Sequence, residues 1–97
     1  MAQIIYAARA LDHLQRAFDF LLENDRGSAI KAAAAIRHAV DALAQHPLIG
    51  HETTGGLREL VISFGRTGYV ALYWFVPERE EIWILAIRHQ RELDYPA

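Results

Sequence analysis

Hydrophobic residues change their spacing halfway along this chain, and that change limits the fold more than any other feature. Before Pro47 they recur every three or four residues, as on one face of a helix, whereas after Gly56 they form short β-type runs. Three such runs cover residues 57–64, 69–76 and 81–88, and a fourth covers 3–7. The chain is therefore predicted to be one α+β domain, residues 1–97, with the order β-α-α-β-β-β.

Two amphipathic helices are predicted between the first and second β-runs. Asn24, Asp25 and Gly27 separate them, Ser28 is the expected N-cap of the second helix, and Pro47 is expected to end it. Because alanines let neighbouring helices approach closely, the two helices should form an antiparallel hairpin. The apolar stripes are expected to be Leu11, Leu14, Phe18, Leu21 and Leu22 on the first helix, and Ile30, Ala33, Ile36, Val40 and Leu43 on the second.

The last three β-runs are joined by short turns, which predicts an antiparallel meander under the helical hairpin. The last two runs are apolar at successive positions, so both of their faces are hydrophobic, whereas antiparallel strands usually keep one polar face. The hairpin can cover only one face. The other face must meet a partner, a terminal segment of the chain or a substrate.

Composition excludes several classes of function. The chain has no cysteine, so it has no disulfide scaffold and no thiolate metal site. Ten Lys and Arg against twelve Asp and Glu give a net charge of −2, which disfavours broad phosphate binding. No metal site is expected from His46, His51 and Glu52, which lack a rigid spacing, and no cofactor is expected. The N-terminus has no secretory pattern and no long apolar segment is present, so the expected location is the cytoplasm, away from membranes.

Four short motifs resemble those of the RelE/ParE family of bacterial toxins from type II toxin-antitoxin systems. They are HPLIG (46–50), LREL (57–60), GY (68–69) and ILAIRHQRELDY (84–95), and the similarity covers nearly the whole chain. The resemblance implies a cognate antitoxin that wraps and neutralises the protein in a hetero-oligomer, with a homodimer as the alternative in the free state. Trp74 and Trp83, on the two-sided apolar strands, are the predicted antitoxin-binding residues.

The family holds two activities, and the resemblance implies different residues for each. RelE-like members cleave messenger RNA on the ribosome, whereas ParE-like members inhibit DNA gyrase. RNA cleavage without a metal needs a base, an acid and cations for the phosphate. The RelE pattern supplies lysines on the second strand and an arginine after GY, but this chain has LVIS and Val70 there. The ParE-like activity is therefore favoured, and a non-toxic binding module is a further alternative.

Site residues follow from these two activities. A nuclease would rely on Arg88, His89, Arg91 and Tyr95, and a target-binding surface would use Arg58, Arg66, Arg88, His89, Arg91 and Tyr95. Most of these residues also have a structural interpretation. Arg58 and Glu59 can form a cross-strand ion pair, Arg66 and Arg91 can be solvated charges, His89 can be a hydrogen-bonded strand end, and Tyr95 can be an aromatic anchor.

Overall fold

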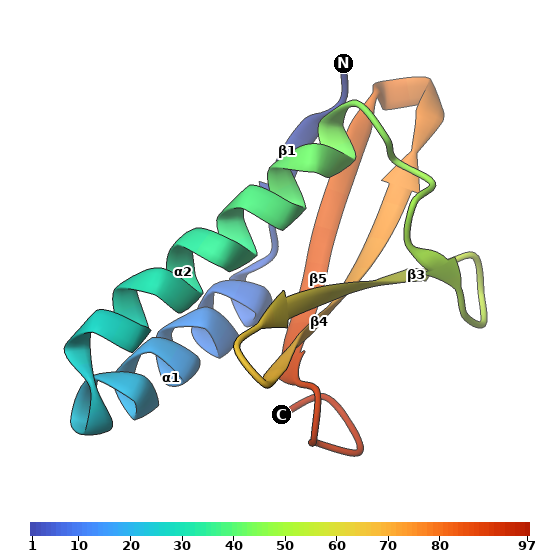
Figure 1. Cartoon of the computed structure of the whole chain (residues 1–97). Helices are drawn as coiled ribbons and strands as arrows, with labels where there is room; N and C mark the ends of the chain where they lie inside the picture. The colour runs from blue at the N-terminus through green and yellow to red at the C-terminus, as the bar shows by residue number, and fades with distance from the viewer.

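Two helices cover one face of the sheet, as predicted, and the sheet has five strands, one more than predicted (Figure 1). The computed structural model describes residues 1–97. The elements are β1 (Gln3–Tyr6), α1 (Ala8–Asn24), α2 (Arg26–Asp41), β2 (His51–Glu52), β3 (Arg58–Phe64), β4 (Thr67–Val76) and β5 (Glu81–His89). The strand order is β1-β5-β4-β3-β2, with β1 parallel to β5 and every other pair antiparallel. No helix is both long and apolar enough to cross a membrane.

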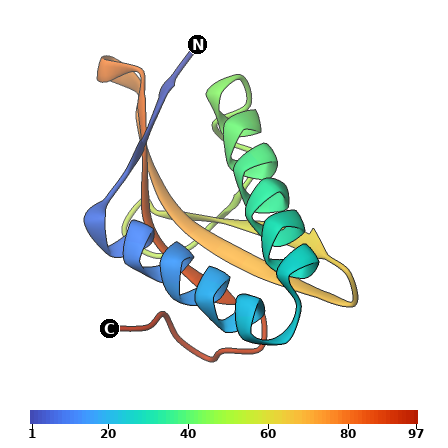
Figure 2. The ribbon, with the colours of Figure 1, turned by 90° about the vertical axis from the view of Figure 1, so that its left-hand side faces the viewer.

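The helical hairpin packs on the sheet through a stripe that differs from the predicted one. Both helices lie on the same side of the sheet (Figure 2), and α2 buries small residues where the sheet approaches closely. Ile30, predicted to be in the core, is 57% exposed, and Ala33 is exposed as well. Leu11 and Leu22 of α1 are likewise exposed. The stripe that is buried on α2 and the following turn is Ala29, Ala32, Ile36, Val40 and Leu43.

The boundaries of α2 also differ from those predicted. Its N-cap is Asp25, whose carboxylate accepts the backbone N–H of Gly27 at 3.0 Å and the hydroxyl of Ser28 at 2.8 Å. The Ser28 hydrogen bond, helped by the backbone, lowers the pKa of the Asp25 carboxyl. Ser28 therefore supports the cap without forming it. The helix ends at Asp41, before Pro47, and a 3-10 turn (Ala42–Ala44) follows it.

The loop predicted between α2 and β3 contains β2, a two-residue strand paired with the start of β3. Gly50, just before it, lies against Tyr73, whose hydroxyl accepts the Gly50 N–H at 3.0 Å and donates to the Pro47 carbonyl at 2.7 Å. A Cβ on Gly50 would lie 2.6 Å from the Tyr73 ring. This close approach fixes the loop to the core and sets the register of β2.

A β-bulge interrupts the pairing of β4 with β5. It reverses which side chains at the C-terminal end of β5 point toward the helices. Tyr73 pairs with Ile84 but Leu72 pairs with Ala86, so Leu85 has no partner. Because side chains alternate along a strand, one extra residue moves every later side chain to the opposite face. Ile87 is consequently buried in the core, where uninterrupted alternation would have placed Arg88.

Candidate functional site

The bulge places Arg88 on the face of the sheet that the helices do not cover, together with Glu59 and Tyr95. The Tyr95 hydroxyl donates to Glu59 Oε2 at 2.6 Å, and the Arg88 guanidinium carbon lies 5.3 Å from the centre of the Tyr95 ring. Arg88 Nη2 is 4.0 Å from Glu59 Oε2. Side chains of Arg88 and Glu59 are both only 18% exposed. These three residues form a partly buried cluster that anchors the C-terminal segment to β3 and β5.

Arg88 directs its other hydrogen bonds to the turn that follows β5. Its Nη1 donates to the carbonyl of Glu92 at 2.9 Å and lies 3.4 Å from the carbonyls of His89 and Gln90. A guanidinium has five N–H donors in a fixed planar arrangement, so it can hold several carbonyls of one turn at once. In this structure Arg88 stabilises the C-terminal turn instead of presenting a free cation.

Tyr95 is poorly suited to lose a proton. Burial is the largest cause of a strongly raised pKa for its phenol, and the hydrogen bond and negative charge of Glu59 raise it further, while the nearby Arg88 opposes them. The hydroxyl therefore stays protonated at neutral pH. It acts as a donor to Glu59 and fixes the end of the chain.

His89 lies on the opposite face from Arg88, toward the helices. Its Nδ1 accepts the backbone N–H of Arg91 at 3.1 Å, and its Nε2 is 3.1 Å from the Thr67 hydroxyl. Because a backbone N–H can only donate, the proton of the neutral ring is on Nε2 and is donated to Thr67. The ring also packs edge-on against Tyr69, with centroids 5.5 Å apart. Both nitrogens of His89 are therefore used to join β4 to the C-terminal turn.

Arg58 and Glu59 make the cross-strand pairs that their structural interpretation predicted. Arg58 donates to Glu52 Oε1 at 3.0 Å and to the Gly50 carbonyl at 2.7 Å. Glu59 Oε1 lies 3.2 Å from His51 Nε2. Glu52 and His51 are the register partners of Arg58 and Glu59 in β2, so these contacts hold β2 to the sheet.

Two of the predicted site residues, Arg66 and Arg91, keep exposed guanidinium groups that pair with no carboxylate. Arg66 lies in the β3–β4 turn and Arg91 in the turn after β5. The Thr67–His89 contact and a hydrogen bond from the Gln90 N–H to the Gly68 carbonyl, at 2.9 Å, hold these turns together. The structure thus brings both arginines to one end of the sheet, with the fully exposed Leu93 between that end and Tyr95.

His13 is a structural residue that the sequence analysis missed. Only 3% exposed, it accepts the Ile87 N–H on Nδ1 at 2.9 Å, and its Nε2 lies 3.0 Å from the Pro96 carbonyl. Arg9 donates to the same carbonyl at 2.8 Å. Strand β1 ends before it could pair with Ile87, so His13 satisfies an N–H that the sheet leaves unpaired. A lone histidine on a helix gives no sequence pattern from which this role could be read.

The apolar second face predicted for the sheet is partly exposed. Val61 is 51% exposed and Trp74 47% exposed, and Trp74 is the register partner of the half-buried Trp83. The Trp83 indole N–H donates to Glu81 at 3.2 Å. The C-terminal tail (residues 93–97) covers this face around Glu59, through Tyr95, and leaves the area around Trp74 open.

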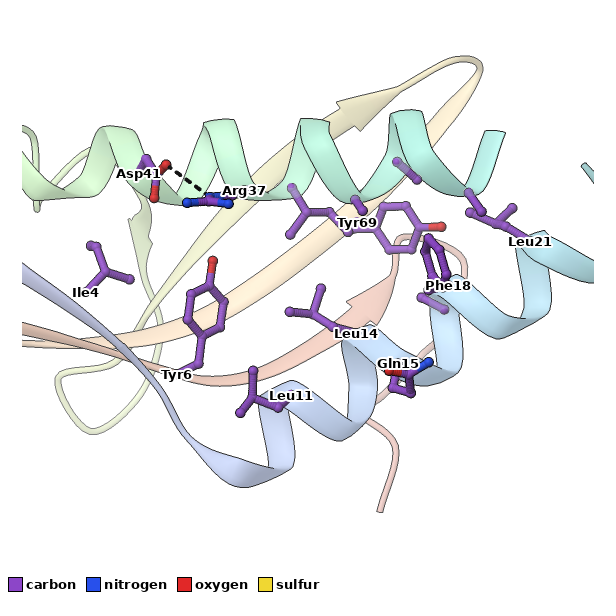
Figure 3. Close-up of a pocket in the computed structure, with 15 residues that line it drawn as sticks. Ile4, Tyr6, Leu11, Leu14, Gln15, Phe18, Leu21, Arg37, Asp41 and Tyr69 are labelled. Atoms are coloured by element: carbon purple, nitrogen blue, oxygen red, sulfur yellow. Dashed lines mark ion pairs between the residues drawn. The ribbon is translucent and has the colours of Figure 1, made fainter. Parts of the chain in front are cut away.

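An apolar groove of about 620 Å³ lies between the two helices and the sheet (Figure 3). Twelve of its fifteen lining residues are hydrophobic, and Figure 3 shows Tyr6 from β1 and Leu14 from α1 pointing into it. Its polar side is the Arg37–Asp41 ion pair at 3.9 Å. Burial, followed by the charge of Asp41, raises the pKa of Tyr6. Sequence periodicity had placed six of the lining residues on the core stripes of the helices and did not predict an opening; they are Leu11, Leu14, Phe18, Leu21, Ala33 and Ile36.

Comparison with protein families gives one match that spans nearly the whole chain. Residues 4–94 match the family described as ParE toxin of the type II toxin-antitoxin system parDE. Two proteins of Caulobacter vibrioides are also similar. Toxin RelE3 is 36% identical over 86 residues, covering 89% of this chain and 88% of that protein. Toxin RelE2 is 32% identical over 93 residues, covering 96% of this chain and 100% of that protein.

Solved structures of low sequence identity share the fold. A chain from the chromosomal ParDE toxin-antitoxin system of P. aeruginosa superposes with a TM-score of 0.71 and 22% identity, over 92% of this chain and 96% of that one. A chain of the intact E. coli RelBE toxin-antitoxin complex superposes with a TM-score of 0.63 and 13% identity, over 95% and 99% of the two chains.

Proposed function

Because this chain belongs to the RelE/ParE family of type II toxins, we propose that it arrests bacterial growth by binding a protein target, with DNA gyrase as the favoured target, and that it does not cleave RNA. In this proposal the toxin acts in the cytoplasm and needs no cofactor. A cognate antitoxin neutralises it.

The observation that carries the proposal is the apolar character of the sheet face around Arg88. Val61 of β3 and Val70 of β4 are on this face: β3 has no lysine where the RelE pattern has several, and Val70 follows the GY pair where that pattern has an arginine. Val70 pairs directly with Arg88. Each cation missing from a crowded phosphate typically costs about 3–4 kcal/mol of transition-state stabilisation. Tyr95 and Arg88, the candidates that remain there, are already bound to Glu59 and to the C-terminal turn.

The free cations at the end of the sheet supply the proposed target contact. Arg66 and Arg91 are exposed and unpaired with any acid, and Leu93, which follows Arg91 closely in sequence, has a fully exposed apolar side chain. Arginine is one of the residues that most often anchor protein interfaces, so the two arginines are the expected main contacts and Leu93 adds apolar area. In this proposal Arg58, Arg88, His89 and Tyr95 act indirectly, because they hold the two turns that carry the contact residues.

The antitoxin is proposed to cover the apolar sheet face around Trp74 and Trp83. Both structural neighbours come from toxin-antitoxin systems, one ParDE and one RelBE. The exposed fractions of Val61 and Trp74 leave an apolar surface beside the tail that an extended or helical segment can bury. The expected complex is a toxin-antitoxin hetero-oligomer, and self-association through the same surface is the alternative for the free toxin.

Expression without antitoxin tests the target. Growth should stop with DNA-damage signals, the purified protein should inhibit gyrase supercoiling, and ribosome-bound messenger should stay intact. The double variant Arg66→Ala/Arg91→Ala should lose this inhibition, whereas Arg26→Ala/Arg79→Ala, which removes two exposed arginines elsewhere, should keep it. Full inhibition by the first variant would show that the end of the sheet is not the contact.

Ribosome-dependent RNA cleavage is the second candidate function. It is favoured by the RelE names of the two Caulobacter relatives and by the closeness of Arg88 to Tyr95. Primer extension on messenger from arrested cells tests it. New 5′ ends at ribosomal A-site codons, absent in a Tyr95→Phe variant of unchanged abundance, would replace the gyrase proposal.

A further inference from the structure

A second cleft, of about 610 Å³, lies between α1 and the C-terminal turn. The turn runs alongside α1 (Figure 2), where Pro96 accepts hydrogen bonds from the helix. In contrast to the groove between the helices, only four of its eleven lining residues are hydrophobic. The lining includes Arg16 and Phe20 from α1 and Arg91 from the turn. This is a polar cleft with one large apolar side chain at its edge.

The cleft has an excess of positive charge. Arg16 and Arg91 are both exposed, and neither makes an ion pair within the chain. Arg88 also lines the cleft, although its guanidinium is directed to backbone carbonyls. The only acid in the lining is Glu92, and its carboxylate accepts the His89 N–H at 2.8 Å. Two free cations thus face the same cleft on a chain whose net charge is −2.

The walls of the cleft are held in place before any ligand binds. His13, at its base, bonds to Ile87 of β5 and to Pro96 of the tail, and so fixes α1 relative to both. Phe20, in contrast, is 66% exposed although it is a large aromatic residue next to the cleft. A site with fixed walls loses little conformational entropy on binding, which favours recognition of a flexible segment.

We propose that this cleft binds an acidic segment of the cognate antitoxin, with Arg16 and Arg91 pairing with its carboxylates and Phe20 covering a neighbouring apolar side chain. Arginine binds carboxylates through two parallel hydrogen bonds, so two arginines at one cleft match a segment with two acidic residues. A nucleic acid is a poorer fit, because strong phosphate binding generally needs more cations than these two. The inference rests on the proposed function, since it takes the chain to have an antitoxin.

The proposal explains how binding would neutralise the toxin. Arg91 belongs both to this cleft and to the surface proposed to contact the target. An antitoxin segment that pairs with Arg91 therefore makes it unavailable to the target. Neutralisation follows from competition for one side chain, without a change in the fold.

A peptide titration of the purified full chain tests the chemistry of the cleft. The probe is a short acetylated peptide in which glutamate alternates with leucine, and its control carries glutamine in place of glutamate. The NMR signals of the Arg16 and Arg91 guanidinium N–H groups should shift with the first peptide only. Arg16→Glu should weaken binding at least about tenfold, as expected for reversing one of two cations, whereas Arg26→Glu, at an exposed arginine outside the cleft lining, should not. If charge reversal prevents folding, Arg16→Gln replaces it as the test variant and should also weaken binding.

The same variants in cells identify the source of the acidic segment. With its antitoxin co-expressed, Arg16→Glu should still arrest growth, whereas the parent chain and Arg26→Glu should be neutralised. Neutralisation of Arg16→Glu with unchanged antitoxin affinity would overturn the proposal. Two other results would also overturn it. If a folded Arg16→Glu chain no longer arrested growth in the absence of antitoxin, the cleft would belong to the target contact. If the cleft bound oligouridylate more tightly than the acidic peptide, its ligand would be a nucleic acid. Antitoxin affinity is measured on purified proteins, so this result stands apart from whether gyrase is the target.

Discussion

Replacing Tyr95 by phenylalanine separates a structural role of this residue from a catalytic one. The substitution keeps the ring under the Arg88 guanidinium and removes only the hydroxyl that donates to Glu59 at 2.6 Å. A hydrogen bond to a charged group contributes about 1.5–3 kcal/mol. Because Glu59 keeps His51 and Arg88 as partners when the hydroxyl is removed, we expect a loss near the lower end of this range, about 1–2 kcal/mol. That loss should lower the melting temperature by about 4–16 °C for a domain of this size.

The measurement is urea unfolding of a double-mutant cycle with Glu59→Gln. A direct interaction between Tyr95 and Glu59 predicts a coupling energy of about 1 kcal/mol or more, whereas independent sites add to within about 0.5 kcal/mol. Tyr6→Phe is the matched control, because the Tyr6 hydroxyl is half-buried but has no hydrogen-bond partner in the chain. It should change stability by less than about 0.5 kcal/mol.

Growth arrest by the same variant decides between the two roles. We expect Tyr95→Phe to stay toxic wherever the protein remains folded, because the proposed target contact lies on other side chains. A variant with unchanged stability that no longer arrests growth would refute this reasoning, since the hydroxyl would then act on the target or substrate and not on Glu59.

Three further outcomes follow from the structure. Replacing His13 by leucine leaves the buried Ile87 N–H without a partner and should destabilise the chain by about 1–3 kcal/mol, seen as faster hydrogen exchange at that amide; His13→Asn, which keeps an acceptor near Nδ1, should cost less. Gly68→Ala forces a Cβ into the Ile62 carbonyl and should cost about 3 kcal/mol in urea unfolding, whereas Gly27→Ala, with its nearest neighbour at 3.4 Å, should stabilise α2 by about 0.5–1 kcal/mol. The four tyrosines should add no pH dependence to stability below about pH 9, and stability should fall above pH 10.0, the unperturbed tyrosine value. Burial raises the pKa of all four, so the folded chain holds their protons more tightly than the unfolded chain does.

Element types and order were predictable because each long element has a hydrophobic period of its own. The helices and the three long strands are found where the spacing predicted them, within a few residues. Strand β2 was not predicted, since two residues are too short to show alternation and their pairing depends on Arg58 and Glu59. The stripe of α2 was misplaced for a different reason. Ile30 is the more hydrophobic residue, but Ala29 and Ala32 allow the close contact that the packing requires.

Arg88 and His89 show why the candidate site was harder to predict than the fold. The sequence places them side by side in a cluster of charged residues, and the structure separates them onto opposite faces. As neighbours in a strand, Arg88 and His89 would point to opposite faces with or without the bulge at Leu85. The bulge decides which of the two points toward the helices: His89 does, and Arg88 does not. Nothing in the local sequence marks that extra residue, because Leu85 is as apolar as its neighbours. The face occupied by each polar side chain after the bulge therefore depends on pairing with β4.

Internal hydrogen bonding then decides which of the predicted residues are free to bind a partner. Arg58, Arg88, His89 and Tyr95 form bonds that hold β2, the C-terminal turn and the tail, whereas Arg91 makes no such bond with its side chain. An arginine already bonded to several carbonyls must lose those bonds before it can bind a partner, so it contributes less to affinity than an unpaired one. The free cations include Arg16, which lies far from Arg91 in sequence and reaches the same cleft only because His13 holds α1 against β5 and the tail. A binding surface of this kind is produced by the tertiary fold, and a short sequence motif contains only part of it.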